Sequence, residues 1–205
     1  MAPHCPSAPH FGDLLPIEPS SETLAFLARR RSASALSLAA PGPSESELSE
    51  ILTLAARAPD HGKLAPWRFI VLRDEAKTVF VKRLEAVAGT RADPAKSLAK
   101  LAKLRTPPVT VAVVSRAAPG GEIPVWEQQL SAGAVCLLML LAAQAMGFGA
   151  NWITDWYAYD VEALNLLGLS PGESVAGYIH LGRCAQAPLE RVRPDLAAIV
   201  ETWAP

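Results

Sequence analysis

Cysteine is scarce in this chain of 205 residues. The three cysteines, Cys5, Cys136 and Cys184, lie far apart in the sequence, and no two of them form a CxxC pair. This distribution supports neither a disulfide framework nor a cysteine-based zinc cluster. It favours a reducing compartment, and we expect a cytoplasmic protein. Cys136 stands in an apolar stretch, where it is most simply a small core residue.

The sequence also lacks the common signatures of enzymes that work through their own side chains. It contains no GxSxG, GxxxxGK[ST] or HExxH pattern, which argues against a serine hydrolase, a P-loop protein and a zincin. Gly147-Phe148-Gly149 follows a predicted helix and lacks a third glycine, so no Rossmann site is predicted. His4, Cys5 and His10 stand on a proline-rich segment, and no metal site is predicted. No catalytic side chain is predicted either, because a bound organic cofactor can supply the chemistry.

Charge of one sign is also missing, since 19 Lys and Arg residues against 20 Asp and Glu residues leave a formal charge of −1. The whole chain therefore has no positive field to attract nucleic acid or an anionic membrane surface. Residues 1–20 are rich in proline and lack the apolar centre of a secretory signal, which predicts an extended or disordered arm. Residues 21–205 are long enough for one domain with a sizeable core.

One long apolar run does stand out. Residues 132–152 contain no charged side chain, and the run is long enough to span a bilayer. Against insertion stand Gly147 and Gly149 near its end and the absence of flanking Lys or Arg. A helix that is apolar all round can equally be a core helix or a subunit interface, and we expect no membrane span here.

Capping signals and apolar spacing predict helices over 21–29, 45–57, 75–88, 96–103, 125–146 and 161–167. Runs rich in β-branched and aromatic residues predict strands over 67–72, 109–114, 148–153 and 175–181. This alternation is typical of an α+β or α/β fold. In the first helix Leu24, Leu27 and Ala28 are predicted to face inward. His180 falls inside an apolar strand, where we predict a hydrogen-bonded core histidine.

Two loop segments concentrate positive charge. Arg29-Arg30-Arg31-Ser32 follows the first helix, and a second basic segment, broken by Pro and Gly, runs from Arg57 to Phe69. Guanidinium groups match a phosphate in bidentate fashion, and a neighbouring hydroxyl adds a hydrogen bond. The pair therefore indicates an anionic ligand. The alternative is structural, because cations at a helix C-terminus favour the helix dipole without any ligand.

The order of several segments resembles the nitroreductase family, and most closely its short YdjA-type branch. The resemblance runs from about residue 22 to residue 185. Its pieces, in chain order, are Arg30-Arg31-Ser32-Ala33-Ser34, Arg57-Ala58-Pro59-Asp60-His61, Pro66-Trp67 with Phe69, Trp126-Glu127-Gln128 with Ser131-Ala132-Gly133, and Gly147-Phe148-Gly149 with Trp152. The ordered set is far more specific than any single piece.

The resemblance implies an α+β flavoprotein with a central mixed or antiparallel sheet flanked by helices. It further implies an intertwined homodimer that binds FMN at the subunit interface. Members of the family transfer hydride from NADH or NADPH through the flavin to nitro compounds, quinones or similar acceptors, in a ping-pong cycle. A non-catalytic protein that binds or sequesters flavin is the alternative. The physiological acceptor and the choice between NADH and NADPH stay open.

The resemblance also implies roles for particular residues. Arg30, Arg31 and Ser32 would hold the phosphate and ribityl end of FMN, and Arg57 and His61 would reach the same flavin from the partner chain. The segment Trp152, Ile153 and Thr154 would line the flavin. A weaker correspondence places the nicotinamide nucleotide along one segment, composed of Ala142, Ala143, Gln144, Ala145, Met146 and Gly147.

The chain departs from the family pattern in three places. Many members carry another arginine three residues after the motif serine, where this chain has Ala35. The proline-rich arm has no counterpart in the pattern, and the tail beginning at Arg191 differs from that of shorter relatives. Arg191 or Arg193 could replace the missing cation, although a solvated surface role is the simpler interpretation.

Overall fold

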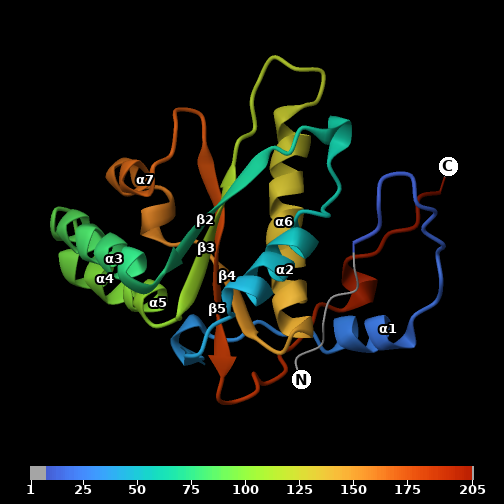
Figure 1. Cartoon of the computed structure of the whole chain (residues 1–205), viewed down its shortest axis with the longest axis horizontal. Helices are drawn as coiled ribbons and strands as arrows, with labels where there is room; N and C mark the ends of the chain where they lie inside the picture. Colours follow the sequence, from blue (N-terminus) through green and yellow to red (C-terminus); the bar gives the residue numbers. More distant parts are fainter. Residues whose placement is uncertain (1–7, 205) are drawn as a thin grey trace.

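An antiparallel sheet with helices on both faces forms the centre of the molecule (Figure 1). The computed structural model describes residues 8–204. The strands follow the order β1-β5-β3-β2, with β4 also paired to β5, and every pairing is antiparallel. Their bounds are β1 (Leu38–Ala39), β2 (Trp67–Arg73), β3 (Val109–Ser115), β4 (Gly149–Ile153) and β5 (Ser174–Cys184). The fold is therefore α+β, as the family resemblance implied.

Helices cover both faces of this sheet. The α-helices are α1 (Ser21–Ala28), α2 (Glu45–Ala55), α3 (Asp74–Gly89), α4 (Pro94–Lys100), α5 (Ala102–Arg105), α6 (Val125–Ala145) and α7 (Val161–Leu167). Short 3-10 turns are η1 (Ala35–Ser37), η2 (His61–Lys63), η3 (Trp156–Ala158) and η4 (Leu196–Ala198). In Figure 1, α2 and α6 lie on one side of the sheet, and α3, α4, α5 and α7 lie on the other.

The central strand β3 explains why the sheet forms where it does. All seven of its residues are buried, and its neighbours β2 and β5 pair with it along its length. A β-branched run flanked on both sides and covered on both faces is the stable environment for such a sequence. The predicted strand over 109–114 is confirmed.

On one face α6 packs against the sheet and against α2. Val135, Cys136, Met139 and Ala143 on its inner side are fully buried in this core. Among the described residues, α6 is the one helix long and apolar enough to cross a membrane, and 50% of its most apolar window is buried inside the protein. Its inner side is thus part of the hydrophobic core.

The other face carries a second core beneath α3, α4, α5 and α7. Tyr157 and Tyr178 are fully buried there, with ring centroids 5.0 Å apart. His180 is fully buried as well, and its Nδ1 lies 2.9 Å from the Thr110 hydroxyl oxygen. The predicted hydrogen-bonded core histidine is confirmed.

Four details of the sequence prediction are wrong. The helix expected over 96–103 breaks at Leu101 into α4 and α5. The strand expected to end near Leu181 continues to Cys184, because the short β1 pairs with its end. β2, whose apolar run predicts a mostly buried strand, is mostly half-buried because it is an edge strand. In α1 no residue is buried, and Leu24 and Leu27 are 68% and 48% exposed.

The arm and the tail lie at the α1 end of the molecule (Figure 1). Residues 8–20 form no helix or strand and are exposed, while residues 1–7 lie outside the described part of the chain. The described arm and the tail together expose a series of large apolar side chains, which are Phe11, Leu14, Leu15, Ile17, Leu189, Val192, Leu196, Ile199, Val200 and Trp203. Within residues 8–204 nothing covers them.

Candidate cofactor site

The arginines of the first cationic segment follow α1 directly. Ser20 caps the helix by accepting a hydrogen bond from the backbone N–H of Thr23 at 3.2 Å, and the helix ends at Ala28 with Arg29 as its C-cap. Arg30, Arg31 and Ser32 come after the last turn. The Arg30 guanidinium donates a hydrogen bond to the Ser32 hydroxyl at 3.3 Å, so two of the predicted phosphate ligands lie together.

This segment is fixed against β4 and the end of α6. The backbone N–H of Ala33 donates to the carbonyl of Ala150 at 3.0 Å, and the Asn151 side-chain amide donates to the carbonyl of Ala33. The Gln144 side-chain amide donates to the carbonyl of Arg31. The structure thus brings the arginine segment next to the strand that carries the predicted flavin-lining residues.

Trp152 lies on the face of β4 that α6 covers. Its indole N–H donates to the Ala176 carbonyl at 3.2 Å, and its side chain is 38% exposed. The ring passes directly over Gly177, where an added Cβ would lie 2.0 Å from the indole nitrogen. Ile153 is half-buried, and so is Thr154, whose hydroxyl accepts a hydrogen bond from Tyr159 at 2.8 Å. All three side chains are therefore partly accessible to solvent.

Only part of the predicted nicotinamide segment is accessible. Ala142, Ala143 and Met146 are buried in the core, whereas Gln144 and Gly147 line a cavity beside the arginine segment. Ala145 is exposed. A nucleotide could therefore meet this segment at its C-terminal end but not along its whole length.

Arg57 and His61 lie elsewhere. Both are exposed, and His61 Nδ1 lies 2.8 Å from a carboxylate oxygen of Glu127 in the first turn of α6. Asp60 holds the loop by accepting hydrogen bonds from the backbone N–H groups of Leu64 and Ala65. Non-glycine residues with positive φ, Lys63 and Ala65, show that this loop is strained.

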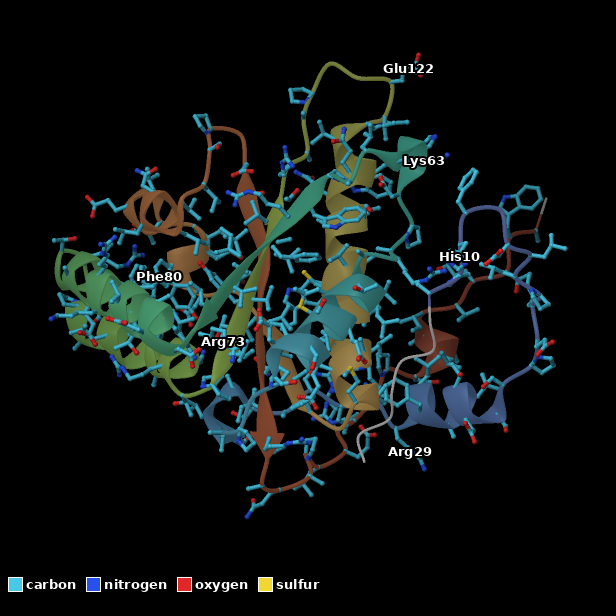
Figure 2. The ribbon with its side chains drawn as sticks, in the orientation of Figure 1. His10, Arg29, Lys63, Arg73, Phe80 and Glu122 are labelled. Atoms are coloured by element: carbon cyan, nitrogen blue, oxygen red, sulfur yellow. The ribbon has the colours of Figure 1, made fainter. Side chains whose placement is uncertain are left out.

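The two cationic segments occupy opposite ends of α6. Glu127 beside His61 and Gln144 beside Arg31 are about 25 Å apart along the helix, at 1.5 Å per residue. Figure 2 shows the same separation, with Lys63 near one end of the helix and Arg29 near the other. A single chain therefore does not bring Arg57 and His61 to the Arg30 segment.

The C-terminal tail adds charge to the first segment. Arg193 donates to the carbonyl of Arg30 at 3.0 Å, and Arg31 donates to the carbonyl of Leu189 at 2.8 Å. Glu190 lies between Arg31 and Arg193. Hydrogen bonding from the backbone N–H of Arg191, together with the nearby arginines, lowers the pKa of the Glu190 carboxyl. The tail thus places one cation, Arg193, and one carboxylate, Glu190, beside the predicted phosphate ligands.

Sequence reasoning missed two polar groups near these segments. Arg183 lines the same cavity as Arg31, and Glu127 pairs with His61. Arg183 was missed because the strand was predicted to end two residues earlier. Only the partner strand β1 reveals that β5 continues, and no local signal marks it. Glu127 belonged to the quoted family pattern, but its spacing gave no sign of the pair with His61.

No group of three or more His, Cys, Asp or Glu side chains within residues 8–204 is arranged to hold a metal ion. The prediction that the arm holds no metal site also concerns His4 and Cys5, which lie outside the described residues.

Comparison with known proteins identifies the family. The sequence model of the nitroreductase family matches residues 27–183. The Escherichia coli K12 protein YdjA, whose name describes it as an NAD(P)H nitroreductase, is 34% identical over 163 residues, which cover 78% of this chain and 87% of YdjA. A Haemophilus influenzae protein named in the same way is 32% identical over 163 residues, 78% of this chain and 88% of its own length. The chain belongs to the nitroreductase family.

Solved structures share the fold. A nitroreductase-like protein of Bacillus cereus aligns with a TM-score of 0.79 and 21% identity, covering 91% of this chain and 98% of that one. A nitroreductase of Desulfovibrio desulfuricans in complex with FMN aligns with a TM-score of 0.70 and 24% identity, covering 91% of this chain and all (100%) of the other. The fold predicted from the family resemblance is confirmed.

Proposed function

We propose that this chain is an FMN-dependent oxidoreductase, which takes hydride from NADH or NADPH and passes it to a small-molecule acceptor such as a nitro compound or a quinone. The observation that carries the proposal is the position of Arg30, Arg31 and Ser32 against β4, in a chain of the nitroreductase family. Relatives named as NAD(P)H nitroreductases support the electron donor. A related structure solved with FMN supports the cofactor.

The residues present fit the phosphate of FMN. The guanidinium of Arg30 and the hydroxyl of Ser32 lie 3.3 Å apart, so both can donate to one anion. Arg193 donates to the carbonyl of Arg30, which places a further guanidinium in reach. Charge-assisted hydrogen bonds of this kind are about twice as strong as neutral ones. At position 35, where many family members carry a cation, this chain has an alanine, which is buried in η1.

Within the segment Trp152, Ile153 and Thr154, the Trp152 ring is the side chain best placed to contact the flavin ring. Trp152 presents an apolar face that is only partly covered, and Gly177 leaves room for the indole against the sheet. When bound, the flavin supplies the hydride chemistry, and the protein supplies position and electrostatics. The side chains named here hold and orient the cofactor, and none needs to act as a nucleophile or base.

The separation of the two cationic segments supports a dimeric site. Within one chain the His61 end and the Arg31 end of α6 lie about 25 Å apart, so we infer that Arg57 and His61 reach the flavin held by Arg30 from a second chain. The outer side of α6 exposes a stripe at helical spacing, with Trp126, Leu130 and Leu137 at 67%, 52% and 43%. An exposed apolar stripe of this kind fits a second copy of the chain.

The alternative, a protein that only stores flavin, differs in its redox behaviour. A ping-pong oxidoreductase must let NADH or NADPH reduce its flavin rapidly, and a storage protein must shield the flavin from both. Anaerobic mixing of the purified yellow protein with each nucleotide separates the two. Loss of the flavin absorbance within seconds supports the enzyme.

The test of the cofactor comes first. The visible absorbance spectrum of the purified protein is recorded, and the chromophore is released by denaturation and identified by chromatography. Release of FMN near one per chain is expected. A colourless protein that takes up no added FMN would contradict the proposal. Rapid reduction by NADH or NADPH, followed by reoxidation with a quinone, completes the test.

A further inference from the structure

A cavity of about 310 Å³ lies along α3 and reaches the end of α5. Its lining combines basic, acidic and apolar side chains, which are Lys77, Thr78, Val81, Lys82, Glu85 and Arg105. Basic groups outnumber the one carboxylate, so the cavity has a net positive charge. In Figure 1, α3 and α5 lie on the side of the sheet opposite α6. The cavity is therefore separate from the proposed cofactor site.

Lys77 is a buried lysine without a carboxylate partner. It is 5% exposed, and its Nζ donates a hydrogen bond to the carbonyl of Pro107. Glu85, the acidic residue of the cavity, pairs with Arg105 instead, and within residues 8–204 no Asp or Glu lies within ion-pair distance of Lys77. A buried ammonium group without a counter-ion is costly, which shifts the equilibrium toward the neutral amine.

The neutral amine is therefore present near neutral pH. Burial lowers the pKa of Lys77 to about 8, so about half of it is neutral at pH 8. An exposed lysine, with a pKa of about 10.4, is roughly 0.4% neutral at that pH. The neighbouring His180 is itself uncharged there, because burial lowers its pKa to about 3. Lys77 thus has a free electron pair that exposed lysines largely lack, and such an amine attacks carbon electrophiles.

The cavity limits which electrophile can react. Since Lys77 is only 5% exposed, the reactant has to be small and uncharged. Carbon dioxide meets both conditions, and the carboxylate that it adds to Nζ takes roughly the room of one or two water molecules, about 30 Å³ each. The new negative charge would lie beside Lys82, which makes no ion pair within residues 8–204.

We propose that Lys77 reacts reversibly with carbon dioxide and carries it as a carbamate. The electron pair of Nζ forms a bond to the carbon, one C=O electron pair moves onto oxygen, and Nζ releases one proton to water. The step consumes no oxidant or reductant. The remaining N–H still donates to the Pro107 carbonyl, and the carboxylate is stabilised by the charges of Lys82 and Arg105.

The first experiment traps the carbamate. The purified protein is equilibrated at pH 8 with a fixed concentration of dissolved carbon dioxide, ethylated with a trialkyloxonium salt, digested and analysed by mass spectrometry. An ethyl carbamate is expected on Lys77 and not on the exposed Lys63. Lys82→Gln is expected to lower the trapped fraction about threefold, since it removes one partly solvated charge interaction. Lys63→Gln is the matched control and keeps the wild-type fraction.

The second experiment measures stability. A ligand that binds only the folded chain raises its melting temperature. At constant pH, carbon dioxide is expected to raise the melting temperature of the wild type and to leave that of Lys77→Met unchanged. If Lys77→Met does not fold, Lys82→Gln keeps the reacting amine and is expected to show a smaller rise than the wild type.

Three results would overturn the inference. The first is the absence of an ethyl carbamate on Lys77 in the wild type. The second is equal trapping on Lys77 and Lys63, which would show ordinary lysine reactivity. The third is a rise in melting temperature without any trapped adduct, which would assign the cavity to non-covalent binding of bicarbonate. None of these measurements involves FMN or a nicotinamide nucleotide, so they are independent of the proposed function.

Discussion

At the scale of single residues, His180 shows how burial controls an ionisable group. Its ring is fully buried in the second core, beside Thr110. Burial, with smaller contributions from the charges of Lys77 and Lys103, lowers the pKa of His180 to about 3. Burial also lowers the pKa of Lys77 to about 8. The folded protein therefore holds His180 neutral well below the pH at which an unfolded chain would protonate it.

The first prediction follows from that shift. Between about pH 6.5 and pH 3 the unfolded chain binds a proton at His180 that the folded chain does not, so stability falls as the pH falls. The slope is roughly 1.4 kcal/mol per pH unit. Urea unfolding at a series of pH values measures the slope of the unfolding free energy against pH. In His180→Gln this slope is expected to lose the contribution of one bound proton. The exposed His10→Gln variant serves as the control and should keep the wild-type slope.

The second prediction concerns Gly177. A Cβ at this position would lie 2.0 Å from the Trp152 indole nitrogen, so Gly177→Ala must displace the tryptophan. We expect a loss of about 1–3 kcal/mol of stability from overpacking and a weaker affinity for FMN. Gly89→Ala has nothing within 4 Å of the added Cβ and is the control. Thermal unfolding and FMN titration measure both effects, and an unchanged FMN affinity would remove Trp152 from the site.

The third prediction tests the phosphate ligands. The double variant Arg30→Ala/Arg31→Ala is expected to lose several kcal/mol of FMN affinity, since each charge-assisted hydrogen bond contributes about 1.5–3 kcal/mol. If the arginines only favoured the end of α1, the variant would lose a few tenths of a kcal/mol of stability and keep its FMN affinity. Equilibrium titration with FMN distinguishes the two outcomes. Arg105→Ala, on α5, is the control.

At the scale of elements, the end of α6 explains the Gly147-Phe148-Gly149 segment. Gly147 has φ of +81°, and the N–H groups of Phe148 and Gly147 donate to the carbonyls of Ala143 and Gln144 at 2.9 and 3.0 Å. This is a Schellman motif, which ends a helix with glycine in the left-handed region. It turns the chain into β4 and presents Phe148 to Arg183, so the glycines serve the fold.

A second link between elements joins β2 to the loop before β5. The Arg68 guanidinium donates to both carboxylate oxygens of Glu173 at 2.8 and 2.6 Å, and to the carbonyl of Gly168 at 3.0 Å. Hydrogen bonding from Arg68, supported by the backbone of Ser170 and the charge of Arg116, lowers the pKa of Glu173 to about 2. The edge strand β2 is thus fixed at its start by side chains.

The fourth prediction concerns this link. Because the folded pKa of Glu173 is below its unfolded value, the link stabilises the protein above about pH 4.5, and that stability is lost as the pH falls toward 2. Glu173→Gln is expected to cost about 1.5–3 kcal/mol at pH 7 and to flatten the acid limb of the stability curve. Urea unfolding at pH 7 and pH 3 measures both. Glu162→Gln, on α7, is the control, and an equal loss in both variants would contradict the role of Arg68.

Local sequence determined most of the elements. The capping box of Ser44 and Glu47 begins α2 as predicted, and α7 has the predicted bounds. The break at Leu101 was not predictable, because the fully buried Leu101 and Leu104 keep the spacing that a continuous helix would also have. β1 was missed because two residues of strand exist only through their pairing with β5.

At the scale of the whole molecule, exposed apolar surface gathers on one side. The outer side of α6, the side chains of α1, the described arm and the tail all leave large apolar groups in solvent. Leu24 and Leu27 were predicted to face a core, and within one chain they face none. A second copy of the chain would cover such a surface, in agreement with the proposed dimer.

The fifth prediction tests that assembly. Leu130→Glu/Leu137→Glu, on the outer side of α6, is expected to yield monomers that have lost most of their FMN, because a dimeric site needs the second chain. Light scattering and the FMN content per chain measure the two effects. Val79→Glu places a charge on an exposed apolar position of α3 and should stay dimeric. A wild-type monomer that holds FMN tightly would contradict the dimeric site.

The sequence by itself determined the family and most of the elements, and it predicted the residue types of the proposed cofactor site, because local spacing and ordered motifs carry that information. The tertiary structure decided where those residues meet. It joined the arginine segment to β4 through the backbone hydrogen bond between Ala33 and Ala150, kept His61 near the far end of α6, and added Arg183 through the pairing of β5 with β1. Contacts between residues distant in the chain depend on the packing of whole elements, and no local pattern encodes them.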